Sequence, residues 1–226
     1  MTQLNEKIRT LEMPDRMKRL SIDQRGFPVP WFVPYIDGKP EFRNFDGEKL
    51  GVAVRHRRCW LCGEQLGVHL TFVLGPMCMV NRTNGEPPCH YDCAHYSVQA
   101  CPFLSQPRMR RNEKDMPESD PCAGYGLKRN PGVVALWTTR SYKLFRAPMG
   151  GKGYLFTIGD PERIEYYAEG RTATRDEIMT SMESGLPLLM KIAEQEGREA
   201  VDELQRKYAQ TIELIPANDE RRMKLA

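Results

Sequence analysis

The sequence predicts an α+β protein, and three patterns along its 226 residues support that fold class. Apolar and aromatic runs broken by turn residues predict β-hairpins in the first half and a small antiparallel sheet after residue 132. Apolar residues at three- and four-residue steps predict C-terminal helices. Between these regions the cysteines gather in one module. The predicted regions are 1–54 (N-terminal helix and β-hairpin), 55–104 (cysteine-rich module), 105–131 (loop or linker) and 132–226 (small sheet and helices).

Composition and charge exclude several classes of protein. Hydrophobic residues make up 40% of the chain and charged residues 28%, values within the range of globular proteins. The net charge of +3 is too small to indicate a nucleic-acid-binding protein by itself. No run approaches the roughly 18 apolar residues of a membrane span, and the charged N-terminus lacks the apolar core of a signal peptide. We therefore expect a cytoplasmic protein that has no membrane partner.

The first 54 residues predict short helices followed by a hairpin. Residues 4–20 predict one or two short helices, with Pro14 suited to a first helical turn. Two apolar and aromatic runs, 28–36 and 39–43, flank an Asp-Gly dipeptide, which is a strong hairpin signal. The prolines in these runs predict edge strands, because proline cannot donate a backbone hydrogen bond to a neighbouring strand.

The cysteine-rich module begins with a Cys-x-x-Cys-Gly motif at residues 59–63, whose glycine permits a turn after the second thiol. Residues 69–74 predict a strand, the following Gly-Pro pair predicts a turn, and residues 77–80 predict a return strand. A helix is predicted from near Pro88 through Cys101. The expected order is therefore a knuckle, a hairpin and a helix.

Four side chains of this module have the spacing of zinc ligands, namely Cys59, Cys62, His90 and Cys93. Two residues between the first two thiols let both point at one ion. The three-residue step from His90 to Cys93 puts both on one side of a first helical turn. A knuckle, a hairpin and a helix that carries the second pair form the treble-clef arrangement. Four protein ligands close the coordination sphere, so we expect one structural Zn2+ per chain.

Other assignments stay open from the sequence alone. Cys89 could replace His90 in a pair with Cys93. The remaining cysteines are Cys78 (an outside candidate on the hairpin), Cys101 (expected in the core) and Cys122 (expected to be incidental, in the loop). Reduced core cysteines without a metal, or a redox-active Cys-x-x-Cys pair, are the alternatives to a metal site.

The last two regions predict a loop, then strands, then helices. The strands are expected at residues 133–139, 142–145 and 154–158, the last two paired across a glycine-rich turn. An Asp-Pro pair predicts a helix from residue 160 to Gly170. A capping box at residues 174–177 and apolar faces over 186–192 and 201–215 predict three further helices.

Two cationic clusters flank the cysteine-rich module. The first contains Arg55, Arg57 and Arg58, and the second contains Arg108, Arg110 and Arg111. If folding brought both to one face, they would form a phosphate-binding surface for nucleic acid. Solvated surface charge is the alternative interpretation.

A metal-dependent nuclease of the HNH type is an alternative function, because treble-clef units also occur in such enzymes. It would need a hairpin histidine as general base, for which His69 is the candidate, with His95 or Asn81 as a helper. The predicted strand lacks the Asp-His or His-His pair of those enzymes. A catalytic zinc with an open ligand position, and with His69 or Glu64 as the base, is a further alternative.

Residues 28–43, 59–63, 75–78, 90–104 and 184–189 carry a family resemblance that spans nearly the whole chain. These segments resemble an uncharacterised protein group from bacteriophage and bacterial mobile-element genomes. The resemblance implies a phage or bacterial origin and the cytosol of a bacterial host, and it implies no catalytic residues. We therefore expect a zinc-binding accessory protein that binds nucleic acid or a host or phage protein. A protein-binding inhibitor of host machinery is the other alternative to the nuclease.

Overall fold

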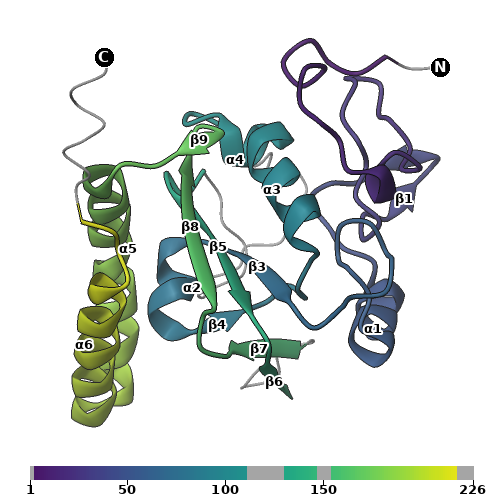
Figure 1. Cartoon of the computed structure of the whole chain (residues 1–226). Coiled ribbons are helices and arrows are strands. Elements are labelled where there is room, and N and C mark those ends of the chain that lie inside the picture. Colours follow the sequence, from purple (N-terminus) through teal and green to yellow (C-terminus); the bar gives the residue numbers. More distant parts are fainter. Residues whose placement is uncertain (1–2, 111–129, 147–153, 218–226) are drawn as a thin grey trace.

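The computed structural model describes residues 3–110, 130–146 and 154–217, and these form an α+β fold (Figure 1). The predicted class, with small antiparallel sheets and C-terminal helices, is confirmed. The elements are, in chain order, η1 (Asp15–Met17), β1 (Tyr35–Ile36), β2 (Lys39–Pro40), α1 (Gly47–His56), β3 (Leu70–Leu74), α2 (Pro76–Asn81), β4 (Thr83–Asn84), α3 (Tyr91–Ala100), α4 (Pro102–Ser105), β5 (Val134–Thr139), β6 (Tyr142–Arg146), β7 (Tyr154–Ile158), β8 (Arg163–Ala168), β9 (Arg171–Thr172), α5 (Arg175–Glu196) and α6 (Arg198–Glu213).

The larger sheet has the strand order β3-β5-β8-β9, and every pair in it is antiparallel. All six residues of β5 are buried, because helices cover both faces of the sheet around it. Figure 1 shows α3 on one side and the α5–α6 hairpin on the other. Helix α2 contacts β3 and β5 as well as α5 and α6, so it fills the space between the sheet and the helical hairpin.

A smaller antiparallel sheet has the order β4-β7-β6. The predicted pairing of the segments at 142–145 and 154–158 is confirmed, while the glycine-rich turn between them lies outside the described residues. Aromatic side chains join the two sheets, since the ring of Phe72 on β3 contacts Tyr142 and Phe156 with centroids 6.0 and 6.2 Å apart. The cysteine-rich region and the C-terminal region therefore share both sheets.

Two predicted elements of this part of the chain are wrong. Residues 76–81 form helix α2 instead of a return strand, because Pro76 follows Gly75 at a first helical position and the consecutive residues Cys78, Met79 and Val80 are all buried. The predicted helix at 160–170 is the hairpin β8–β9, closed by Glu169 and Gly170 with φ of 53° and 77°. β3 pairs with the distant β5, a choice that no local pattern reveals.

The C-terminal helices follow their sequence signals in most respects. Thr174 and Glu177 form the predicted capping box at the start of α5, and α6 corresponds to the predicted last helix. The two helices expected between 174 and 197 are one helix of 22 residues, with Pro187 in its interior. A continuous buried stripe, including Met182, Leu189 and Ala193, holds this helix together across the proline.

The N-terminal region has less regular structure than expected. The short helices predicted at 4–20 reduce to the single 3-10 turn η1, with Pro14 just before it, whereas the hairpin β1–β2 forms around Asp37 and Gly38 as predicted. Helix α1 was not predicted; its N-cap residue is Asp46, whose carboxylate accepts hydrogen bonds from two backbone N–H groups of the first turn. Within the described ranges, no helix has the length and apolar character needed to cross a membrane.

Candidate metal centre

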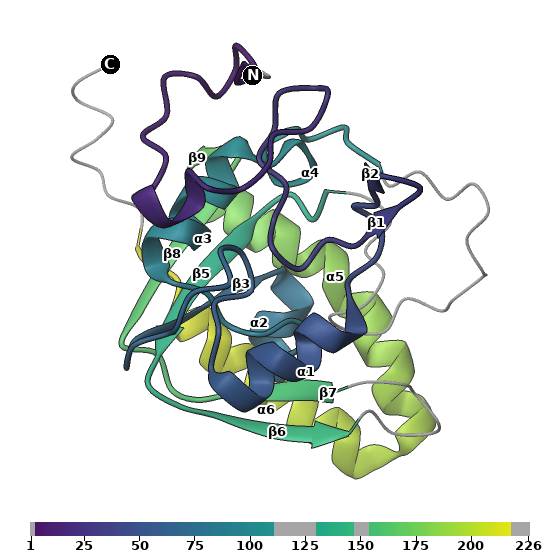
Figure 2. The same cartoon turned by 90° about the vertical axis from the view of Figure 1, so that its right-hand side faces the viewer.

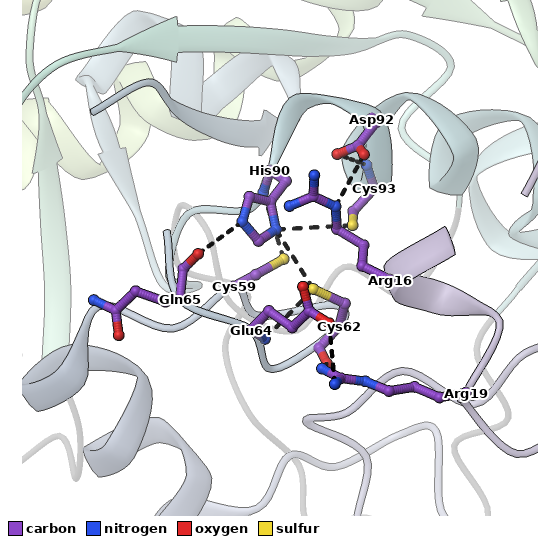
Figure 3. Close-up of polar contacts among 9 residues, drawn as sticks. All are labelled: Arg16, Arg19, Cys59, Cys62, Glu64, Gln65, His90, Asp92 and Cys93. Carbon is purple, nitrogen blue, oxygen red and sulfur yellow. Dashed lines mark hydrogen bonds and ion pairs between the residues drawn. The ribbon is translucent and has the colours of Figure 1, made fainter. Parts of the chain in front are cut away.

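Folding brings together the four side chains predicted as ligands. One ligand atom from each of Cys59, Cys62, His90 and Cys93 lies within 4.8 Å of all the others. Figure 3 shows the three thiols and the imidazole pointing toward one another. The three cysteines are at most 1% exposed. Cysteine and histidine side chains converging at these distances could hold a metal ion.

The first pair lies on a tight turn after α1. The backbone N–H of Gly63 donates to the carbonyl of Cys59, and the N–H of Cys59 donates to the carbonyl of Glu64. Gly63 has φ of +77°, a left-handed conformation that glycine adopts without steric cost. The N–H of Glu64 then points at the Cys62 sulfur over 3.5 Å. The turn thus aims both thiols inward and supplies a hydrogen bond to one of them.

The second pair lies at the start of α3, where His90 is the N-cap residue and Cys93 is in the first turn. Its position is set by the larger sheet, because the neighbouring Cys89 exchanges two backbone hydrogen bonds with Thr71 of β3, at 2.7 and 3.0 Å. The backbone N–H of His90 donates to the Cys59 sulfur over 3.4 Å. Strand β3 therefore positions the second pair, and the N–H of His90 links it to the first pair.

The ring of His90 has a defined orientation. Its Nδ1 lies 3.4 Å from the sulfur of Cys62 and 4.0 Å from that of Cys93, while its Nε2 lies 3.0 Å from the carbonyl oxygen of Gln65. A carbonyl can only accept, so Nε2 carries a proton and Nδ1 is the atom directed at the thiols. Metal-bound histidines use one nitrogen for the ion and donate from the other in this way.

The four side chains of the centre favour a negative charge on Cys59 and a positive charge on His90. Burial raises the pKa of the Cys59 thiol, but hydrogen bonds from the neighbouring thiols outweigh burial and lower it below its ordinary value. Burial lowers the pKa of His90, but hydrogen bonds with Cys59 and Cys62 outweigh it and raise the pKa to about 10. The thiolate therefore attracts positive charge into the centre, which a metal cation would supply in place of the imidazole proton.

Two arginines of the N-terminal region reach the centre, a feature that sequence spacing does not reveal. Arg16 forms an ion pair with Asp92 at 3.0 Å, and Asp92 accepts a hydrogen bond from the backbone N–H of Cys93. Arg19 forms an ion pair with Glu64 at 3.0 Å and also donates to the carbonyl oxygen of Cys62. Figure 3 shows both arginines extending from the N-terminal segment toward the ligands.

The other cysteines are not members of the group. Cys78 is buried in α2, and Cys101 follows α3 as its C-cap residue, where burial raises the pKa of its thiol. Cys89 is buried beside the centre and its thiol hydrogen-bonds Cys59, but it is not part of the four-residue group. Cys122 lies outside the described residues.

The histidines considered for catalysis have other partners. His69 precedes β3 and lies 2.8 Å from a carboxylate oxygen of Glu162. The ring of His95 on α3 stacks on Tyr91 and meets Tyr167 edge to face. Neither histidine belongs to the metal-capable group, and the described part of the chain contains no second group of that kind.

The two cationic clusters lie on different parts of the fold. Arg55 is in the last turn of α1, Arg57 ends that helix in a left-handed conformation, and Arg58 follows it. Arg108 and Arg110 are exposed after α4, whereas Arg111 lies outside the described residues. Both views show α1 and α4 well apart (Figures 1 and 2).

Comparisons of the chain with protein-family models, with curated proteins and with solved structures give no match.

Proposed function

We propose that this chain is a zinc-stabilised accessory protein without enzymatic activity, which binds nucleic acid through the arginines at the end of α1. The observation that carries the proposal is the closed group of three thiols and one imidazole immediately after those arginines. A phage or bacterial origin, and work in the host cytosol, are part of this proposal. They rest on the resemblance of five sequence segments described above.

Zinc is the ion that suits the donors best. Three sulfurs and one nitrogen are a common ligand set of structural zinc, which prefers a tetrahedron. With Zn–S and Zn–N distances of about 2.3 and 2.0 Å, the sulfur and nitrogen corners of that tetrahedron lie about 3.5 Å apart. The two distances from Nδ1 of His90 to the sulfurs of Cys62 and Cys93, 3.4 and 4.0 Å, lie on either side of this value. Little rearrangement would be needed to bind the ion.

Four protein ligands also argue for a structural role. A catalytic zinc keeps one position for water or substrate, while this group fills all four. Glu64, which could act as a base, is held in an ion pair with Arg19. The proposed function of the ion is therefore to fix the turn at 59–63 against the start of α3.

The paired arginines should strengthen zinc binding. Three thiolates and one Zn2+ leave a net negative charge, to which Asp92 and Glu64 add, so Arg16 and Arg19 balance the centre. We expect the double variant Arg16→Gln/Arg19→Gln to lower zinc affinity about 10- to 100-fold, the usual effect of removing such outer partners. Competition with a chromogenic chelator measures this. Lys18→Gln is the control from the same segment, because Lys18 pairs with Asp15 and not with Asp92 or Glu64; equal affinities for both variants would contradict the prediction.

The cationic residues at the end of α1 support nucleic acid as the partner. Arg55 and Arg57 are exposed, and among the described residues no carboxylate pairs with them or with Arg58. The guanidinium groups of Arg57 and Arg58 donate to the carbonyls of Gly67 and Gly63. They are thus fixed beside the turn at 59–63 while keeping further N–H donors for phosphate oxygens.

Salt dependence tests this proposal. Each phosphate neutralised contributes about −0.9 to the slope of log affinity against log salt, so three arginines predict a slope of roughly −2 to −3. The triple variant Arg55→Gln/Arg57→Asn/Arg58→Gln should lose most of the affinity for labelled DNA or RNA and flatten the slope. Asparagine is chosen at 57 because it tolerates the left-handed backbone there.

The control removes three exposed charges from the distant helices α5 and α6. Lys191→Gln/Arg198→Gln/Arg206→Gln changes the net charge equally and should bind as the unaltered protein does. Equal losses in both variants, or binding that is insensitive to salt, would overturn the nucleic-acid proposal. Replacing Arg108 and Arg110 in addition tests whether the second cluster contributes. Metal-dependent nicking of a plasmid that His69→Ala abolishes would favour the nuclease instead.

A further inference from the structure

Strand β6 forms an open edge of the smaller sheet. It is the last strand in the order β4-β7-β6, and β7 is its one paired neighbour among the described residues. Figure 2 shows β6 along the lower border of the molecule, with β7 above it. An edge strand presents backbone donors and acceptors that a further strand can pair with.

The register identifies which backbone groups face outward. Tyr142 lies opposite Ile158, and one step before them the N–H of Gly159 donates to the carbonyl of Ser141 at 3.0 Å. Bonded and non-bonded pairs alternate along antiparallel strands, so Lys143 and Phe145 bond to β7. The N–H and C=O groups of Tyr142, Leu144 and Arg146 therefore point away from the sheet.

The side chains of β6 are exposed and mix apolar with cationic character. Leu144 and Phe145 are 37% and 38% exposed, and because adjacent residues point to opposite faces, each face of the edge carries one of them. Lys143 and Arg146 are also exposed and form no ion pair with the described residues. Neither β6 nor β7 contains a carboxylate. The edge therefore has net positive charge.

The positive charge of the β6 edge favours one kind of binding partner over a second copy of this chain. A second copy that paired here would bring its own Lys143 and Arg146 to the same edge, and this gathering of like charges opposes the pairing. We propose that the β6 edge binds an extended, acidic segment of a partner protein, which adds to the sheet as a further strand. The best segment has two acidic residues flanking two apolar ones, so that opposite charges meet at both ends.

A synthetic peptide provides a direct test. A fluorescent peptide with the core Glu-Val-Val-Glu is titrated with the full-length protein, and its anisotropy is compared with that of a peptide with the core Lys-Val-Val-Lys. We expect the acidic peptide to bind at least about tenfold more tightly, because two cross-strand charge pairs change from repulsive to attractive. The variant Lys143→Glu/Arg146→Glu should reverse this preference. A preference that does not respond to the reversal overturns the proposal.

A second variant separates strand addition from simple charge attraction. Leu144→Pro removes one outward N–H and leaves the hydrogen bonds to β7 intact, so the sheet should persist while the acidic peptide binds at least about tenfold more weakly. Leu144→Val keeps the N–H and should bind normally. Undiminished binding by Leu144→Pro would show that the backbone edge is not used, and would overturn the proposal.

The other occupants give distinct results. A concentration-dependent dimer in sedimentation, lost in Leu144→Pro, would make a second copy the occupant and contradict the proposal. Binding of labelled DNA that is lost in Lys143→Glu/Arg146→Glu but kept in Leu144→Pro would make phosphate the ligand, and would likewise contradict it. All of these variants keep Arg55, Arg57 and Arg58, so the peptide measurements are independent of the proposed nucleic-acid surface.

Discussion

Cys62→Ser and Cys93→Ser are each expected to abolish zinc binding and to unfold the region around the centre. Each removes one of four converging ligands, and serine does not replace a thiolate as a zinc ligand. Zinc binding by such sites supplies on the order of 10 kcal/mol of apparent free energy at neutral pH, which is comparable to the whole stability of a domain. Loss of the ion should therefore cost far more than an ordinary core substitution.

Metal analysis, which gives the zinc content, and urea unfolding, which gives the unfolding midpoint, test this expectation. The unaltered protein should contain one zinc per chain, and a strong chelator should lower its unfolding midpoint as the two serine variants do. Cys78→Ala is the matched control, since Cys78 is equally buried but lies in α2 outside the group. It should keep the zinc and lose only the stability of a small core substitution.

Two further variants test whether His90 or Cys89 is the fourth ligand. Cys89→Ser should keep the zinc, because Cys89 lies beside Cys59 without belonging to the group, whereas His90→Ala should lose it or weaken it severely. Full zinc content in Cys93→Ser would show the ligand assignment to be wrong. Zinc lost in Cys89→Ser and kept in His90→Ala would move the fourth ligand to Cys89.

Gly63→Ala should destabilise the protein by about 2–4 kcal/mol, through backbone strain and overpacking together. The left-handed conformation at this position disfavours any side chain. An added Cβ would also lie 2.7 Å from Cγ of Trp31, a ring that packs on the turn. Because this turn carries the first two thiols, the substitution should weaken zinc binding as well.

Gly67→Ala is the control for this second prediction. It lies four residues further along the same loop, has no positive φ, and has no atom within 4 Å of the added Cβ. Its midpoint in urea should match that of the unaltered protein. Equal midpoints for the two alanine variants would contradict the strain described at Gly63.

Short-range signals predicted much of the fold and of the candidate centre. The two ligand pairs have fixed local spacings, and the Asp-Gly turn at 37–38 and the capping box at 174–177 depend on neighbouring residues alone. Each of these patterns has a direct stereochemical cause, and the structure contains the corresponding feature.

The features that sequence reasoning missed depend on distant partners. Residues 77–80 are predicted to pair with β3, but β3 pairs with the distant β5, and residues 76–81 form α2. Arg16 and Arg19 reach the centre from the N-terminal region, and nothing in their local sequence indicates that contact. The Asp-Pro pair at 160–161 is a local signal for a helix, but residues 163–172 form a hairpin. Its first strand, β8, pairs with the distant β5, which the local sequence does not indicate.

Thr71 of β3 connects the segment that carries the second ligand pair to the larger sheet. Its backbone N–H and C=O both bond to Cys89, next to the ligand His90, while within the sheet it lies opposite Thr138 of β5, whose hydroxyl oxygen lies 2.9 Å from its own. Elements linked by shared backbone hydrogen bonds open and close as one cooperative unit in hydrogen exchange. We therefore expect the centre and the larger sheet to exchange as one foldon, so that the slowest-exchanging amides of β5 also report on the stability of the metal centre.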